Sequence, residues 1–219
     1  MKKLIIFDLD GTLIDTLDDL KNSVNYAIEK YGYPLRTKEE IRKAIGNGVA
    51  VLVARSIPDG DQNPNYPEIL KIFKEHYSIH SRELTGPYEG ITEVLKGVRS
   101  AGFMTAVATN KVHPIAVEII NDFFPNCFDY ILGDVAGRPN KPAPDMIEKI
   151  LEDLHLTKEE SIYVGDTNVD EQTALNSKVD YVLVSYGFRT KEEILEQCKC
   201  RTIIESTEKL LEHLKSLNN

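Results

Sequence analysis

The apolar positions of this chain follow a helical period in its first third and a mixed pattern after it. A short apolar run, Leu4-Ile5-Ile6, predicts a buried strand. Apolar residues then recur every three or four positions until about residue 80, interrupted by glycines and by a polar segment at 58–65. The predicted helices cover Leu17 to Tyr31, a short segment from Lys38 that Thr37 caps, Val49 to Ile57, and Pro67 to His80.

From Pro87 onward, short apolar strands alternate with helices, which is typical of βαβ units and a parallel sheet. The predicted strands are Phe103 to Ala108, Tyr130 to Leu132, Ser161 to Val164 and Tyr181 to Val184. The predicted helices are Ile91 to Ala101, Pro114 to Phe123, Asp145 to Leu154, Val169 to Asn176, Lys191 to Gln197 and Thr207 to Leu217. Because the opening strand has no strand partner in the helical stretch after it, we expect it to pair with these later strands.

The helical stretch is therefore an insertion between the first strand and the rest of the sheet. We expect an α/β protein in which residues 1–15 and 86–219 form a Rossmann-like core with a parallel sheet. Residues 16–85 are expected to form an inserted α-helical cap domain. A chain of 219 residues is long enough to bury a substantial core and carry such an insertion.

The charge of the chain restricts its partners. Charged residues make up 28% and apolar residues 42%, and the formal net charge is -9. This excess of negative charge argues against general nucleic-acid binding, and it means that an anionic substrate would need locally concentrated positive charge. No apolar run approaches membrane-spanning length and the start has no signal-peptide pattern, so we expect a cytoplasmic protein with no membrane partner. The sequence leaves open whether it is a monomer or a homodimer.

The cysteines do not suggest a disulfide framework. There are three of them, Cys127, Cys198 and Cys200, which is an odd number in a chain without an export signal. The pair Cys198-x-Cys200 has no second Cys/His pair at a matching ligand spacing, so a structural metal is disfavoured.

The most informative stretch is Phe7-Asp8-Leu9-Asp10-Gly11-Thr12, which directly follows the opening apolar run. It brings two carboxylates to the end of a buried strand, and Gly11 allows the chain to leave that strand sharply. When two carboxylates lie this near to each other, keeping both ionised costs free energy. Either a cation lies between them or one of them holds a proton at neutral pH.

Polar residues also follow the other predicted strands. The strand that ends at Ala108 is followed by Thr109, Asn110 and Lys111. The strand that ends at Leu132 is followed by Asp134 and then Lys141, and the strand that ends at Val164 is followed by Asp166 and Asp170. Parallel strands present their carboxyl ends at one edge of a sheet, so these residues are expected to converge there. Several carboxylates with one amine and one hydroxyl would suit a hard cation, most simply Mg²⁺, beside an anion held by Thr109, the Asn110 region and Lys141.

Phosphate is the natural anion for such a site. Phosphoryl transfer needs an in-line nucleophile, cations on the phosphoryl oxygens and an acid for the leaving group. A carboxylate can act as the nucleophile, and a second acid two residues on can protonate the leaving alcohol and then activate water. The cation and Lys141 would supply positive potential at the site, although the net charge of the chain is negative.

Four segments resemble the four motifs of haloacid-dehalogenase-type phosphatases, in the same order and spacing. They are Phe7-Asp8-Leu9-Asp10-Gly11-Thr12-Leu13, Ala108-Thr109-Asn110, Lys141-Pro142-Ala143-Pro144-Asp145 and Val164-Gly165-Asp166-Thr167-Asn168-Val169-Asp170. The resemblance implies an HAD-like fold, with Asp8 as the phosphoryl-accepting nucleophile and Asp10 as the acid/base. It also implies that Thr109, Asn110 and Lys141 bind the phosphate and that Asp8, the Asp10 carbonyl and Asp166 bind Mg²⁺. Asp170 would orient Lys141.

Two further segments resemble the phosphoglycolate phosphatase branch of that family. They are Ile45-Gly46-Asn47-Gly48-Val49, with Leu52 and Arg55 beyond it, and Val182 to Arg189 near the last motif. The chain departs from that branch at Ser177-Lys178, where Ala-Gly is usual, and a residue with a side chain there strains a helix end that needs a positive φ. Asn47 could present backbone amides to a substrate or be a plain turn, and Arg55 could bind a substrate carboxylate or form a structural ion pair.

The resemblance implies a magnesium-dependent phosphatase of a small phosphorylated metabolite, with phosphoglycolate first. Alternatives within the family are a phosphosugar mutase of the β-phosphoglucomutase type, a pyrophosphatase and a 5′-nucleotidase. A non-catalytic phosphate-binding module is a different class, and it is disfavoured because Asp8, Asp10 and Lys141 are all present. The spacing of His76, His80 and His113 does not suggest a metal site.

Overall fold

The computed structural model describes residues 1–46 and 48–218, and the chain divides into two compact units. The first unit is Met1–Ile14 together with the chain from Pro87 onward, and the second is Asp15–Gly86. The short strands β2 (Ile14–Asp15) and β3 (Gly86–Pro87) pair where the chain passes from one unit to the other. The long helical run in the sequence is therefore a contiguous insertion into the first unit.

The first unit contains a six-stranded sheet in the order β5-β4-β1-β6-β7-β8, in which every described pair is parallel. The strands are β1 (Leu4–Phe7), β4 (Met104–Val112), β5 (Tyr130–Asp134), β6 (Ser161–Gly165), β7 (Asp180–Val184) and β8 (Ile203–Ile204). The helices are α5 (Ile91–Ser100), α6 (His113–Phe123), α7 (Asp145–Asp153), α8 (Asn168–Ser177), α9 (Lys191–Gln197) and α10 (Thr207–Ser216), with a 3₁₀ turn at Lys158–Glu160. The predicted α/β fold with a parallel sheet is confirmed.

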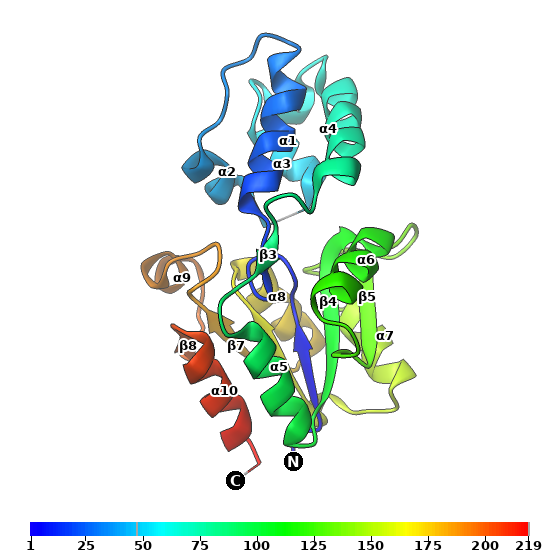
Figure 1. Cartoon of the computed structure of the whole chain (residues 1–219), viewed down its shortest axis with the longest axis vertical. Helices are drawn as coiled ribbons and strands as arrows, with labels where there is room; N and C mark the ends of the chain where they lie inside the picture. The colour runs from blue at the N-terminus through cyan, green and yellow to red at the C-terminus, as the bar shows by residue number, and fades with distance from the viewer. Residues whose placement is uncertain (47, 219) are drawn as a thin grey trace. The chain divides into compact units, whose positions relative to one another are not determined.

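The opening strand β1 lies inside the sheet between β4 and β6 (Figure 1), and all of its side chains are buried. Successive side chains of a strand point to opposite faces, so Ile5 and Phe7 enter one apolar cluster and Leu4 and Ile6 enter another. Helices α5, α6 and α10 supply the first cluster, and α7 with Ala174 of α8 supplies the second. Full burial of each of these side chains stabilises the fold by about 1.5 to 3 kcal/mol.

The order of the strands places the switch point of the sheet at β1. The chain proceeds from β1 to β4 and β5 on one side, and then to β6, β7 and β8 on the other. Ligands of open α/β sheets bind beyond the carboxyl ends of the strands at such a point. The residues that follow β1, β4 and β6 are therefore the ones to inspect.

Two details of the sheet differ from the prediction. Strand β8 was not predicted, because its two residues are too few to show a period. Strand β4 continues past Ala108 to Val112, and its register with β5 shifts between these residues. Ala108 pairs with Leu132 and Val112 pairs with Asp134, so the chain advances four residues on β4 but two on β5. Strand β4 therefore carries a β-bulge-like irregularity at Thr109 to Lys111.

The second unit is helical, as its period predicts. It contains α1 (Leu17–Glu29), α2 (Lys38–Ala44), α3 (Val49–Arg55) and α4 (Tyr66–His80), and the predicted loop at 58–65 includes a 3₁₀ turn at Gly60–Gln62. Thr37 forms the predicted capping box, because its hydroxyl accepts from the Glu40 amide and the Glu40 carboxylate accepts from the Thr37 amide.

Cys127, Cys198 and Cys200 are free thiols. Lys178 ends α8 with φ 60° and ψ 40°, which is the left-handed conformation anticipated for that position. Within residues 1–46 and 48–218, no helix is long and apolar enough to cross a membrane.

Candidate active site

The strand ends bring the sequence-predicted acids together. Asp8 directly follows β1, Asp166 directly follows β6, and Asp170 lies in the first turn of α8. One carboxylate oxygen of each lies within 4.8 Å of the others, and all three side chains are buried. Asp8 thus forms one acidic cluster with two aspartates that lie 158 and 162 positions further along the chain.

Lys141 is the cation of this cluster. Its Nζ lies 2.7 Å from Asp8 Oδ1 and 2.8 Å from Asp170 Oδ1, and only 3% of its side chain is exposed. Burial alone would lower the pKa of Lys141, but the charges of Asp170 and Asp8 outweigh it and raise the pKa above its ordinary value. Lys141 is therefore a fixed positive charge beside the Asp8 carboxylate.

The main chain of Lys141 is held by Asn110. The side-chain Nδ2 of Asn110 donates to the Lys141 carbonyl oxygen at 3.0 Å, and the backbone amide of Lys141 donates to Asn110 Oδ1 at 2.8 Å. This reciprocal pair ties the loop after β5 to the end of β4. The Asn110 side chain thus positions the backbone of Lys141, a contact that its predicted role at the phosphate did not anticipate.

Asp170 is held by the turn that starts α8. Its Oδ2 accepts from the Thr167 amide at 3.0 Å and from the Thr167 hydroxyl at 2.7 Å, which forms a capping box. Burial would raise the pKa of Asp170, but Lys141 and these hydrogen bonds outweigh it and lower the pKa. An ionised Asp170 oriented toward Lys141 is the arrangement predicted from the motif.

Burial disfavours the ionised forms of the other two acids, Asp166 and Asp8. Burial, followed by the charges of Asp170 and Asp8, raises the pKa of Asp166 well above its ordinary value. Burial also raises the pKa of Asp8, and Lys141 only partly offsets it. Lys141 contacts two of these three buried carboxyl groups, Asp8 and Asp170, so a divalent cation among the oxygens of all three would relieve the remaining repulsion. The donor set of buried carboxylate oxygens fits a hard cation such as Mg²⁺.

Asp166 is also fixed by the loop after β7, which the prediction did not include among the site residues. The Phe188 amide donates to Asp166 Oδ2 at 2.8 Å, and the Thr12 hydroxyl donates to Asp166 Oδ1 at 3.5 Å. A Cβ added at Gly187 would lie 1.9 Å from the Gly11 carbonyl oxygen and 2.9 Å from Asp166 Oδ2. Gly187 is thus required for the close approach of this loop to the opening motif.

Tyr163 is a second residue that sequence reasoning missed. Its hydroxyl accepts from Lys141 Nζ at 2.9 Å and donates to Asp170 Oδ1 at 3.0 Å. In the sequence it is one aromatic position of an apolar strand, so nothing distinguishes it from a core residue. The buried hydroxyl nevertheless completes the network that holds Lys141.

Asp10 points to a different partner from Asp8. Its Oδ1 lies 2.9 Å from the Nζ of Lys111, and the two side chains are 20% and 4% exposed. Thr109 is buried beside them, and its hydroxyl oxygen accepts from the Lys111 amide at 3.1 Å. Thr109 and Lys111 both lie within the irregularity of β4. The edge therefore holds two lysines with different partners, Lys141 between Asp8 and Asp170 and Lys111 beside Asp10.

The candidate specificity residues Asn47 and Arg55 belong to the inserted unit. Asn47 lies outside the described residues. Arg55 donates from Nη1 to the Ala44 carbonyl oxygen at 2.9 Å, which supports the end of α2. His76 Nδ1 lies 3.0 Å from Ser23 Oγ, and the His76 ring stacks on Tyr26 and His80.

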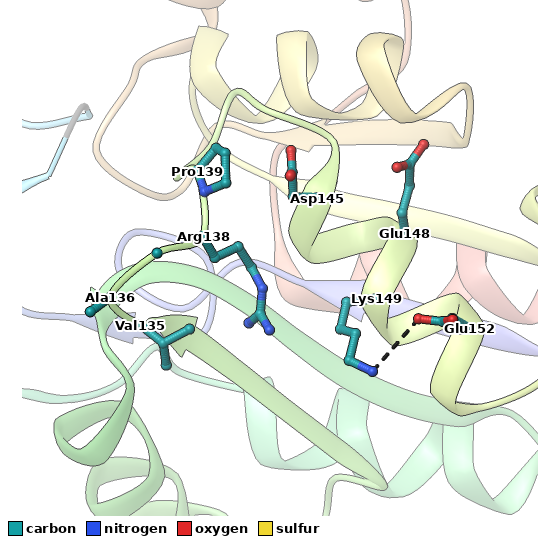
Figure 2. A pocket seen from close by; sticks show the side chains of 9 residues that line it. Val135, Ala136, Arg138, Pro139, Asp145, Glu148, Lys149 and Glu152 are labelled. Atoms are coloured by element: carbon teal, nitrogen blue, oxygen red, sulfur yellow. Dashed lines mark ion pairs between the residues drawn. The ribbon is translucent and has the colours of Figure 1, made fainter.

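A pocket of about 710 Å³ lies elsewhere on the first unit, between the loop after β5 and α7 (Figure 2). It is lined by Val135, Ala136, Gly137, Arg138, Pro139, Asp145, Glu148, Lys149 and Glu152. None of the acids at the strand ends lines it. The candidate site is therefore identified by its chemistry and not by this pocket.

Comparison with known proteins agrees with the motif resemblance. A family model described as haloacid dehalogenase-like hydrolase matches residues 5–184. A phosphoglycolate phosphatase from Cereibacter sphaeroides is 32% identical over 189 residues, covering 84% of this chain and 86% of that protein. One from Pseudomonas putida is 31% identical over 194 residues, covering 86% of this chain and 71% of that protein.

A solved structure gives the same result. A crystal structure from Lactobacillus delbrueckii subsp. bulgaricus, provisionally named a phosphoglycolate phosphatase, superimposes with a TM-score of 0.92. It is 33% identical and covers 98% of this chain and 99% of that one. The match therefore covers the chain of both units. The chain belongs to the haloacid dehalogenase-like hydrolase family, in the branch that resembles the phosphoglycolate phosphatases.

Proposed function

We propose that this phosphoric monoester hydrolase is magnesium-dependent and that 2-phosphoglycolate is the first candidate for its substrate. The observation that carries the proposal is the buried cluster of Asp8, Asp166 and Asp170 around the single ammonium of Lys141. The names of the relatives from Cereibacter sphaeroides and Pseudomonas putida support the choice of substrate.

Asp8 is the nucleophile in this proposal. Its carboxylate is buried, its Oδ1 is held by Lys141, and it lies at the strand end where an incoming phosphate meets it. Attack on phosphorus forms an aspartyl-phosphate and releases the alcohol. Lys141, the Thr109 hydroxyl and the backbone near Asn110 hold the phosphoryl oxygens.

Asp10 is the acid and base. It follows Asp8 by two residues, and its carboxylate is directed to Lys111 and not to the acidic cluster. It gives a proton to the oxygen of the departing alcohol, and it later takes one from the water that hydrolyses the aspartyl-phosphate. Separate partners for the two acids allow separate roles.

Asp8 and Asp166 would hold Mg²⁺, with the Asp10 carbonyl oxygen as a further ligand. When bound, the cation supplies positive charge for the phosphoryl oxygens and favours the ionised form of Asp8. Asp170 completes the acidic cluster, but its oxygens are already engaged by Lys141 and Thr167, so its role is to orient Lys141. The helical insertion, residues 16–85, is proposed to act as the cap that selects the leaving group.

The test is the release of inorganic phosphate from 2-phosphoglycolate and from p-nitrophenyl phosphate. Activity is expected to need added Mg²⁺ and to be removed by EDTA. Asp8→Asn is expected to lower kcat by at least about 1,000-fold, because the amide cannot accept the phosphoryl group. Glu93→Gln, an exposed change on α5, is the control and should retain activity.

Two outcomes would contradict the proposal. An Asp8→Asn variant with wild-type activity would remove Asp8 from the role of nucleophile. Conversion of β-glucose 1-phosphate to glucose 6-phosphate without release of phosphate would show a mutase, in which the phosphoryl group passes to a sugar hydroxyl and not to water.

A further inference from the structure

Lys111 is a second buried lysine at the catalytic edge, and the proposed hydrolysis of a phosphate ester does not by itself require it. Lys141 already serves the nucleophile and the phosphoryl oxygens. Only 4% of the Lys111 side chain is exposed, and its Nζ lies 2.9 Å from Asp10 Oδ1. A buried ammonium costs several kcal/mol of desolvation unless its partners compensate for it, so this position is costly to maintain without a use.

The strand irregularity places Lys111 on the leaving-group side of the site. The register of β4 against β5 shifts between Ala108 and Val112, and Lys111 lies in that interval. The shift is tightly packed, since a Cβ added at Gly133 would lie 2.5 Å from the Lys111 carbonyl oxygen. Its ammonium consequently meets Asp10, the acid assigned to the departing alcohol, while Lys141 meets Asp8.

Simple distances show what Lys111 could reach. A general acid lies within about 3 Å of the oxygen that it protonates. When Oδ1 of Asp10, which lies 2.9 Å from Lys111 Nζ, carries the proton, Nζ therefore lies no more than about 6 Å from the ester oxygen. In 2-phosphoglycolate the carboxylate is separated from the ester oxygen by one methylene, which places its oxygens about 3 Å from that oxygen. The ammonium and the substrate carboxylate can therefore meet at hydrogen-bond distance.

The charge of the edge supports the same assignment. A carboxylate on the leaving group would lie beside Asp10, the acid that neither Lys141 nor a cation held by Asp8 and Asp166 neutralises, and the negative charge of Asp10 would repel it. A cation beside Asp10 removes this repulsion at the place where it would be greatest. A leaving group without a carboxylate is not repelled in this way and does not need a cation beside Asp10.

We propose that Lys111 determines specificity for a carboxylate-bearing leaving group, by binding the substrate carboxylate through the ammonium that holds Asp10. This inference rests on the proposed phosphatase function and deepens it. It assigns the preference for an acidic alcohol to the core of the enzyme, where Lys111 lies at the end of β4.

The experiment compares two esters of nearly equal size, 2-phosphoglycolate and ethyl phosphate, which differ by the carboxylate. Lys111→Met should lower kcat/KM for 2-phosphoglycolate by roughly 10- to 100-fold more than for ethyl phosphate, the effect of one charged hydrogen bond. Any effect of the substitution on Asp10 acts on both esters and cancels in the ratio. Lys111→Arg should restore much of the preference for 2-phosphoglycolate, because the guanidinium keeps the charge.

Lys96→Met, an exposed lysine of α5, is the matched control and should leave the ratio unchanged. The Tm of each variant shows whether it is folded. Equal loss on both esters, or a wild-type enzyme that does not favour 2-phosphoglycolate, would overturn the inference while leaving the phosphatase function intact. Failure of the wild-type enzyme to release phosphate from any ester in Mg²⁺ would instead overturn the proposed function, and the inference with it.

Discussion

Asp8 and Asp166 are buried acids whose pKa values are raised, and this has a consequence for the stability of the metal-free protein. Burial raises the pKa of Asp8 from 3.8 to about 7, and Asp166 shifts in the same direction. A carboxyl whose pKa is higher in the folded state gives stability that is fully present below pH 4 and is lost as the pH rises through about 7. Each pKa unit corresponds to about 1.4 kcal/mol.

We therefore expect the Tm in EDTA to fall by several degrees between pH 5 and pH 8, and Mg²⁺ to reverse most of that fall. Asp8→Asn cannot ionise, so it should flatten the pH dependence in EDTA. Thermal unfolding over this pH range, with and without Mg²⁺, measures both effects. A Tm in EDTA that rises between pH 5 and pH 8 would contradict this account of the acidic cluster.

Tyr163 contributes one hydroxyl to the same network. Tyr163→Phe would leave one proton of the buried Lys141 ammonium without its acceptor, while the ring could still pack in the core. We expect a loss of about 1 to 2 kcal/mol in the free energy of unfolding and a fall of about 10-fold in kcat, as Lys141 becomes less firmly held. Urea unfolding and steady-state kinetics test this. Wild-type values for both would mean that Asp170 and Asp8 suffice to position Lys141.

At the scale of the element, α8 carries strain at its C-terminal end. Lys178 occupies the left-handed region with φ 60°, where a side chain costs roughly 1 kcal/mol relative to glycine. Lys178→Gly should therefore raise the free energy of unfolding by about 1 kcal/mol, whereas Lys178→Ala should not. Urea unfolding of the three proteins makes the comparison. A stabilised alanine variant would show that loss of the lysine side chain, and not the backbone strain, is responsible.

Strand β4 shows how an element departs from its sequence pattern. Its apolar positions predict a strand that ends at Ala108, and the following Thr109-Asn110-Lys111 are expected as loop residues of the site. The structure instead extends the strand to Val112 with a shifted register. The extra residues give Lys111 its contact with Asp10 and Asn110 its contact with the Lys141 backbone, which alternation along a regular strand would not predict.

At the scale of the whole molecule, one residue joins the two ends of the inserted unit. The buried carboxylate of Asp19 in α1 accepts hydrogen bonds from the amides of Leu84 and Thr85 and from the Thr85 hydroxyl. These residues are 65 and 66 positions away in the sequence. The contact closes the unit near the point where the chain leaves it.

Asp19→Ala would leave these donors without their acceptor, so we expect a loss of about 2 to 4 kcal/mol in the free energy of unfolding. Cleavage by trypsin within the inserted unit should become faster, since local opening of that unit needs less free energy. Glu29→Gln, on the exposed face of α1, is the control. Equal rates of cleavage in the wild-type protein and the Asp19→Ala variant would show that Asp19 does not hold the ends of the unit together.

The local pattern of the sequence was sufficient for the helices, the main strands and the parallel sheet. Periodicity identifies an element because it reports which face is buried, and this holds wherever an element is long enough to repeat. Strand β8 was too short for that. The convergence of Asp8, Lys141, Asp166 and Asp170 was also predictable, because each follows a strand and parallel strands share one carboxyl edge.

The pairing of side chains at that edge depends on how distant parts of the chain pack together. The contacts of Lys111 with Asp10, of Tyr163 with Lys141 and of Phe188 with Asp166 join residues 101, 22 and 22 positions apart. Lys111 lies in the shifted register of β4, and Tyr163 occupies a strand position that is like that of any aromatic core residue. The contact of Phe188 needs the close approach of backbones that Gly187 permits. A local pattern records burial but not partners at such separations. The set of polar residues that meet at this edge was therefore predictable from the sequence, while the partner of each acid was determined by the packing of the sheet.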